Sequence, residues 1–139
     1  MCKQISDRLH RTSTGWVTLA ALVVFLLFTA LVLPTQSANS TGAEGVGSPD
    51  TSFFYTPADL YRMAEAYGEE GRAAYVRARA TFDVVWPLLY LAFLATAISW
   101  ATRRAFRPES LWQRANLVPV LGALFDVLEN LATSVVMLR

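Results

Sequence analysis

Residues 117–138, LVPVLGALFDVLENLATSVVML, form a continuous apolar run that is interrupted by Asp126, Glu129 and Asn130. An α-helix rises about 1.5 Å per residue, so this run would reach roughly 33 Å, and the hydrocarbon core of a bilayer is about 30 Å thick. A carboxylate near the bilayer centre costs on the order of 2.5–3.5 kcal/mol on insertion scales. We therefore expect a membrane-spanning helix whose two carboxyl groups face other helices or trapped water.

The composition of the 139-residue chain also favours a membrane protein. Hydrophobic residues make up 54% of the chain and charged residues only 17%, against about 25% charged residues in a soluble domain. The net charge of +1 gives no argument for a nucleic-acid partner. Cys2 and His10 are the only residues of their types, which excludes disulfide frameworks and zinc or histidine-based catalytic sites within the chain. We expect no metal and no cofactor.

Residues 16–33 carry no charge and begin with Trp16, at the position of an interfacial aromatic anchor, so they are the first predicted span. The basic stretch before them is expected to be a short polar tail. A cleaved secretory signal has the same order of segments. Its apolar core is usually 7–15 residues, however, and Gln36 stands where cleavage after Ala38 would need a small residue. We favour an uncleaved span.

Residues 35–83 are predicted to form an outer region made of a loop and an amphipathic helix. Pro34 is expected to end the first span, and the Ser-, Thr- and Gly-rich residues 35–52 are expected to be a flexible loop. Thr56, Pro57 and Asp59 form a helix-start pattern, and Gly68 is a natural stop. One apolar face at helical spacing is formed by Leu60, Met63, Ala64 and Tyr67.

The second span is predicted at residues 84–102 and contains Pro87 and Tyr90. Arg79 precedes Asp83 by one turn, so the two can pair at the membrane edge, where an exposed pair contributes about 0.3–0.5 kcal/mol. Pro87 frees the carbonyl of Asp83 from its helical hydrogen bond. Such a freed group either accompanies a simple kink or contributes to a polar site at membrane depth.

The third span carries a polar stripe, spaced mostly by threes and fours, at Pro119, Gly122, Asp126, Glu129, Asn130 and Thr133. Gly122 would allow close approach of another helix. On an antiparallel second span, Tyr90 would lie near the depth of Glu129 and Asn130, so it is the first expected partner of that pair. The predicted polar pocket consists of Asp83, Tyr90, Asp126, Glu129 and Asn130, with Gly122 and Pro87 as helix-packing residues.

Three functions are compatible with this cluster. It can be structural, with carboxyl and amide groups that hydrogen-bond between helices. It can be a binding or proton-exchange site, because burial raises carboxyl pKa values. It can also act on a lipid-like substrate, with Glu129 or Asp126 as general acid or base. The sequence shows no nucleophile, paired metal ligands or phosphate loop near the cluster, so whether the chain is an enzyme stays open.

Several segments resemble a group of small uncharacterised bacterial membrane proteins. The resemblance is carried by YTP at 55–57, YGEEGRAAY at 67–75, Asp83 with Pro87 and Tyr90, and FDVLEN at 125–130. It covers roughly residues 56–130 and implies a four-span helical protein of unknown activity. This chain ends after its third predicted span, so the resemblance leaves two possibilities, a shortened version or a fragment, with a missing helix supplied by a partner or by self-association.

We therefore expect an all-α transmembrane helical bundle with three spans and one outer amphipathic helix, in a single domain of residues 1–139. Seven arginines and lysines lie in the two segments expected on the inner side, against four in residues 35–83, which favours a cytoplasmic N-terminus in the plasma membrane. The expected role is an accessory or ligand-binding membrane protein with the lipid bilayer and a partner membrane subunit or a second copy as partners. The alternative is a membrane-embedded enzyme or proton-coupled carrier that uses the same carboxyl groups.

Overall fold

The computed structural model describes residues 2–39, 49 and 52–138, and these residues contain helices and turns without any β-strand. The elements are α1 (Cys2–Thr12), α2 (Gly15–Asn39), α3 (Pro57–Ala105), the 3-10 helix η2 (Leu111–Leu117) and α4 (Val118–Met137). The all-α prediction is therefore confirmed. The predicted third span at 117–138 differs by one residue at each end from α4.

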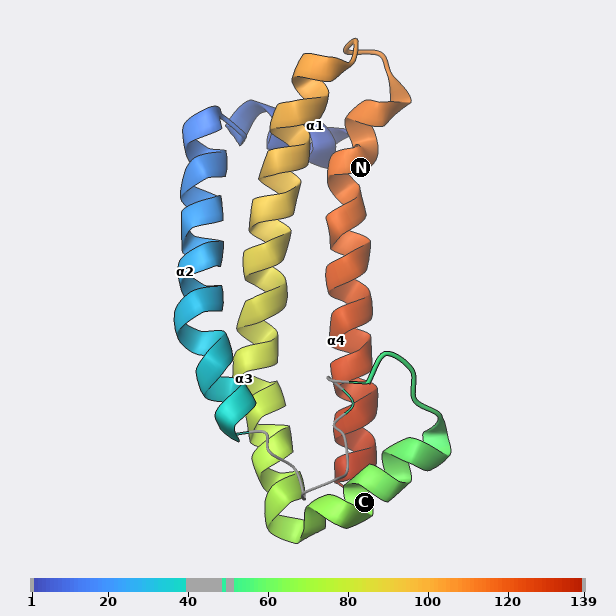
Figure 1. Cartoon of the computed structure of the whole chain (residues 1–139). Coiled ribbons are helices and arrows are strands. Elements are labelled where there is room, and N and C mark those ends of the chain that lie inside the picture. The colour runs from blue at the N-terminus through green and yellow to red at the C-terminus, as the bar shows by residue number, and fades with distance from the viewer. Residues whose placement is uncertain (1, 40–48, 50–51, 139) are drawn as a thin grey trace.

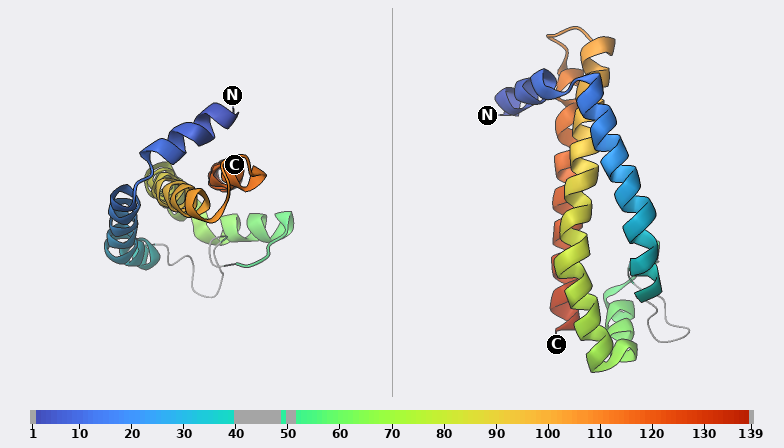
Figure 2. Two further views of the ribbon diagram at one scale, coloured as in Figure 1. Left: turned by 90° about the horizontal axis from the view of Figure 1, so that it is seen from above. Right: turned by 90° about the vertical axis from the view of Figure 1, so that its left-hand side faces the viewer.

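Three long helices run side by side, with α3 between α2 and α4 (Figure 1). The view along the helices shows α2 and α4 on different sides of α3 (Figure 2). All three are long and apolar enough to cross a membrane. Many of their leucines and valines are exposed, among them Leu27, Leu31, Leu121 and Leu131. In water such a surface would be costly, whereas lipid tails cover it without penalty.

Aromatic side chains join α2 to α3. The ring of Phe25 lies 5.3 Å from that of Trp86 and 5.5 Å from that of Phe93, measured between centroids. Phe28 stacks on Phe82 at 5.5 Å. Offset aromatic pairs at such distances contribute about 0.5–1.5 kcal/mol each. The contact between α2 and α3 is therefore apolar, in contrast to the polar contact between α3 and α4.

The first span extends further than the sequence predicts. We expected Pro34 to end the helix, but α2 continues through it to Asn39, so that prediction was wrong. A proline inside a helix removes one hydrogen bond and strains one turn, and the helix can resume beyond it. The rest of the predicted loop, at 40–48 and 50–51, lies outside the described residues.

The start of α3 confirms the predicted cap. The Thr56 hydroxyl accepts a hydrogen bond from the Asp59 backbone N–H at 3.2 Å, and the Thr56 N–H donates to Asp59 Oδ2 at 2.8 Å. Gly68 then adopts φ 62° and ψ −176°, and the chain turns sharply before the helix resumes. A β-carbon disfavours a positive φ, so glycine suits this turn. The predicted stop at Gly68 is thus a change of direction within α3.

The segment 57–67 lies across the C-terminal end of α4 (Figures 1 and 2). Its predicted apolar face is buried there, because Leu60 and Ala64 form one cluster with Tyr75 and Met137. Met63 is also buried, and Tyr67 packs against the cluster from its edge. This amphipathic segment therefore packs on the end of a long helix of its own chain.

The predicted short polar tail contains a helix, α1, which was not predicted from the sequence. In α1 the side chains of Ser6 and His10 are 2% and 9% exposed. The helix crosses the end of the molecule where α3 is joined to α4 (Figure 2). Isolated helices of this length are marginal in water. Tertiary contacts described below therefore stabilise α1.

The Gln113 side chain of η2 helps to hold the connection between α3 and α4. Its amide nitrogen donates to the backbone carbonyls of Thr102 in the last turn of α3 and of Phe106 and Arg107 just beyond it, at 3.0–3.3 Å. Carbonyls at a helix end lack a full set of intrahelical partners. Gln113 therefore ties η2 to the end of α3 and to the turn that follows it.

Candidate polar site between α3 and α4

Arg79 of α3 lies at the centre of a polar contact between α3 and α4. Its guanidinium pairs with Asp83 one turn further on and donates to Asn130 Oδ1 of α4 at 3.0 Å. It also donates to the Tyr75 hydroxyl at 2.7 Å and lies 4.6 Å from the centroid of that ring. The predicted Arg79–Asp83 pair is confirmed, and it is joined to α4.

The contact continues along α4 through Asp126. Asn130 donates to Asp126 Oδ1 at 3.1 Å, and the Tyr90 hydroxyl of α3 donates to Asp126 Oδ2 at 3.1 Å. Both oxygens of this carboxyl group therefore accept a hydrogen bond. We call the connected set the Arg79 network; its members are Tyr75, Arg79, Asp83, Tyr90, Asp126 and Asn130.

Four of the five predicted pocket residues belong to this network, and Glu129 does not. Glu129 lies on the exposed side of α4, where its carboxylate accepts a hydrogen bond from the Tyr55 hydroxyl at 2.9 Å. Burial and the neighbouring Glu129 carboxylate raise the pKa of Tyr55 to about 12, so the phenol stays a neutral donor. The Tyr90 hydroxyl donates to Asp126, one helical turn away from the pair of Glu129 and Asn130 for which we expected it to be a partner.

The buried stripe of α4 contains four residues of the predicted stripe, Pro119, Asp126, Asn130 and Thr133, but neither Gly122 nor Glu129. Its members are Pro119, Ala123, Thr133 and Met137, with Asp126 and Asn130 half-buried between them. Adjacent residues of a helix point about 100° apart, so Glu129 and Asn130 cannot both face α3. Gly122 is exposed, and an added β-carbon would meet no atom within 4 Å. Its predicted packing role therefore stays a prediction for a contact with another chain. Pro87, in contrast, is fully buried.

The Arg79–Asp83 pair is sequestered rather than exposed. The two side chains are 11% and 14% exposed, so the low contribution expected of a surface pair does not apply. Removing one partner of a buried pair leaves an uncompensated charge and is strongly destabilising. The sequence could not show this burial, because it depends on the packing of α3 against α4, where Arg79 meets Asn130.

A second polar centre, which sequence reasoning missed, lies at the opposite end of the molecule. Asn116 is fully buried and donates to Ser99 Oγ at 2.9 Å, while Ser6 Oγ donates to Asn116 Oδ1 at 2.9 Å. Ser6 and Ser99 are also buried. We call these three residues the Asn116 cluster. It joins α1, α3 and η2, and the only sequence signal was an asparagine directly before an apolar span.

His10 and Arg103 reinforce this centre. The two ring nitrogens of His10 lie 3.1 Å from the Ser99 carbonyl oxygen and 2.9 Å from the Gln113 carbonyl oxygen. Arg103 donates to the backbone carbonyl of His10 at 2.7 Å. The histidine thus connects α1 to both sides of the turn between α3 and α4.

The chemistry of the two centres is that of hydrogen bonding and charge pairing. Within the described ranges, no three His, Cys, Asp or Glu side chains lie close enough together to hold a metal ion. Comparisons of the chain with protein-family models, curated proteins and solved structures find no match. The site must therefore be interpreted from its own geometry.

Proposed function

We propose that the chain is a small integral membrane protein that acts as an accessory or ligand-binding subunit, with the Arg79 network as its functional site. In this proposal α2, α3 and α4 pack as a bundle across the plasma membrane, with α1 on the cytoplasmic side. We also propose that the chain is related to small bacterial membrane proteins with four spans. A partner subunit or a second copy of the chain would then cover the exposed side of α4.

The observation that carries the proposal is the bridging role of Arg79. One guanidinium joins a carboxylate on its own helix to an amide on α4, and that amide leads to a second carboxyl group, Asp126. Asp126 and Tyr90 are only half-buried. A ligand or a neighbouring helix can therefore reach the hydrogen-bonding groups at one end of a fixed polar network.

The composition of the network favours binding over proton transport. Arginine keeps its charge at any accessible pH, and the asparagine amide does not titrate. Arg79 and Asn130 connect the two carboxyl groups, so they interrupt any path that would pass a proton from Asp83 to Asp126. A fixed network of this kind suits recognition of a polar group.

The distribution of basic residues supports the proposed orientation. α1, the end of α3 and η2 contain Lys3, Arg8, Arg11, Arg103, Arg104 and Arg114, and Arg107 lies in the connecting turn. Short loops rich in arginine and lysine stay on the cytoplasmic side. The Arg79 network then lies toward the opposite side of the membrane.

The test is native mass spectrometry of the full chain after gentle extraction into detergent. We expect wild type to retain a second chain or a bound small molecule, and Asp126→Asn to lose about tenfold in occupancy, the effect of roughly 1.4 kcal/mol. Thr96→Ala is the matched control, because Thr96 Oγ1 bonds only to carbonyls of its own helix. Recovery of wild type as a bare monomer, or an unchanged occupancy in Asp126→Asn, would contradict the proposal.

A further inference from the structure

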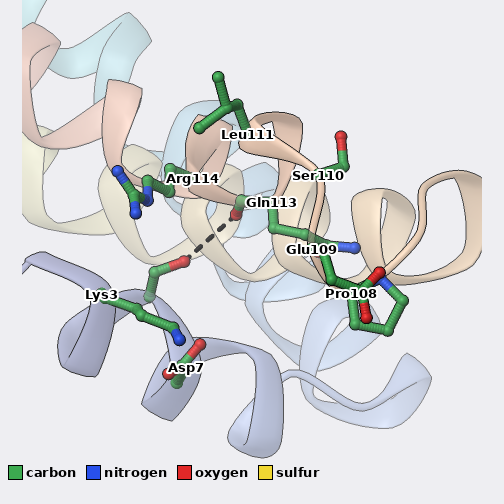
Figure 3. A pocket seen from close by; sticks show the side chains of 9 residues that line it. Lys3, Asp7, Pro108, Glu109, Ser110, Leu111, Gln113 and Arg114 are labelled. Atoms are coloured by element: carbon green, nitrogen blue, oxygen red, sulfur yellow. Dashed lines mark hydrogen bonds between the residues drawn. The ribbon is translucent and has the colours of Figure 1, made fainter.

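A cleft of about 410 Å³ lies between α1 and the turn that joins α3 to α4. Figure 3 shows Lys3 and Asp7 on the α1 side and Arg114 with Glu109 on the other side. The hydrogen bond from Ser6 Oγ to the Gln113 carbonyl, 3.2 Å long, joins the two walls. The cleft is remote from the Arg79 network and has no part in the function proposed above.

The charges of the cleft are balanced and unpaired. It contains two cations, Lys3 and Arg114, and two anions, Asp7 and Glu109. The ion pairs that the structure describes are Arg62–Asp59 and Arg79–Asp83, and within the described part of the chain none of the four cleft residues is paired. Four unpaired charges of both signs around one cavity suit a ligand that carries both signs itself.

Gln113 lines the cleft, but its side-chain amide is directed away from a ligand there. The amide nitrogen donates to the backbone carbonyls of Thr102, Phe106 and Arg107, and the amide oxygen is buried. The groups of the cleft that can hold a ligand are therefore the four charged side chains.

The position of the cleft indicates the source of the ligand. Leu111 and Trp112 of η2 are 77% and 65% exposed beside it, and Trp16 at the start of α2 is 82% exposed. Exposed tryptophans at the ends of apolar helices lie at the depth of lipid headgroups. The cleft therefore opens where phospholipid phosphates and amines are concentrated.

We propose that this cleft binds the headgroup of an ethanolamine phospholipid. Lys3 and Arg114 hold the phosphate from opposite walls, since charge-assisted hydrogen bonds to phosphate are strong. Asp7 and Glu109 accept hydrogen bonds from the primary ammonium group. A choline headgroup has no N–H to donate, and a glycerol headgroup has no positive charge. The cleft thus distinguishes ethanolamine from both.

The test measures binding of three phospholipids with identical acyl chains to the full chain in detergent, by native mass spectrometry. We expect wild type to bind the ethanolamine lipid about fivefold more tightly than the choline or glycerol lipid, as charge-assisted hydrogen bonds predict. Arg114→Gln should weaken all three lipids. Asp7→Asn with Glu109→Gln should remove only the preference for ethanolamine.

Arg104→Gln is the matched control, because Arg104 lies at the same end but stacks on Trp100, at 4.0 Å from its ring, outside the cleft. Equal affinities for the three lipids in wild type would overturn the proposal. A preference for the anionic glycerol lipid that falls equally in Arg104→Gln and Arg114→Gln would also overturn it, since it would indicate general attraction to a basic surface. Circular dichroism of each variant checks that the helices are retained.

Discussion

The Arg79 network and the Asn116 cluster both join helices through buried polar side chains, but the first contains charges and the second is neutral. In the Asn116 cluster, two hydroxyls and an amide satisfy one another while being almost fully buried. In the Arg79 network, a guanidinium is paired with a carboxylate and the half-buried members remain accessible. Neutral groups can be buried completely at low cost, whereas charges require a partner. Complete burial therefore suits the neutral centre, whereas the charged centre keeps accessible groups, as the proposed binding role requires.

The largest expected effect on stability comes from removing only one partner of the Arg79–Asp83 pair. Arg79→Leu leaves Asp83 buried without a cation and should lower the free energy of unfolding by about 3–5 kcal/mol. Arg79→Leu with Asp83→Leu should recover most of this loss. Denaturant titration in detergent measures both. Arg77→Leu is the control, since Arg77 is exposed on the same helix. If the double variant were as unstable as Arg79→Leu alone, the loss would come from other contacts of Arg79 and not from an unpaired Asp83 carboxylate.

At the neutral centre, Asn116→Ala should leave the buried hydroxyls of Ser6 and Ser99 without their shared partner. The cost is about 1–3 kcal/mol, and it should fall on the docking of α1. Hydrogen exchange of α1 should increase while exchange around Asp126 stays unchanged. Faster exchange at both ends would contradict the independence of the two centres.

Substitution at the Gly68 turn should lower stability to an intermediate extent, and only at the end of the molecule that holds the Arg79 network. Gly68→Ala places a β-carbon at φ 62° and ψ −176°, a backbone region that essentially only glycine adopts, and should cost about 1–3 kcal/mol. Segment 57–67 should then exchange faster and α1 should not. Ala74→Ser is the control, since Ala74 is exposed on the helix beyond the turn. Equal stability of Gly68→Ala and Ala74→Ser would show that the turn is not required.

The smallest effect is a pH response at the start of α3. Hydrogen bonds from the Thr56 hydroxyl and backbone N–H, and the pairing with Arg62, lower the pKa of Asp59 to about 2. Because the pKa of Asp59 is lower in the folded protein, its ionised carboxylate stabilises the fold fully at pH values above the ordinary pKa of 3.8. This stabilisation is lost as the pH falls to about 2. Carboxyl NMR titration should show the low value, and Thr56→Val should raise it.

The sequence predicted the apolar helices well because their lengths and compositions are local properties. Thr56, Pro57 and Asp59 likewise indicated the start of α3 from neighbouring residues alone. Pro34 misled the prediction because a proline removes one helical hydrogen bond, and the helix can resume beyond it. Local sequence patterns therefore predicted which segments are helical more accurately than they predicted where those helices end.

The polar centres were predicted only in part, because they depend on which helix faces meet. Asp126 and Asn130 were recognised from charge within an apolar run, and Arg79 was recognised only as a partner of Asp83. The rotation of α4 that excludes Glu129 from the network follows from packing against α3. Asn116 gave almost no signal, since its partners Ser6 and Ser99 are far away in the sequence.

The amide of Gln113 has a consequence for biogenesis. By donating from η2 to carbonyls at the end of α3 and in the turn just beyond it, Gln113 closes the hairpin of α3 and α4 through short-range contacts that can form early. The charge of Arg79 on one arm is matched by groups on the other, so each arm alone would carry unmatched polar groups into lipid. We therefore expect the two arms to insert together, as a preformed hairpin, and a chain cut within the turn to insert poorly.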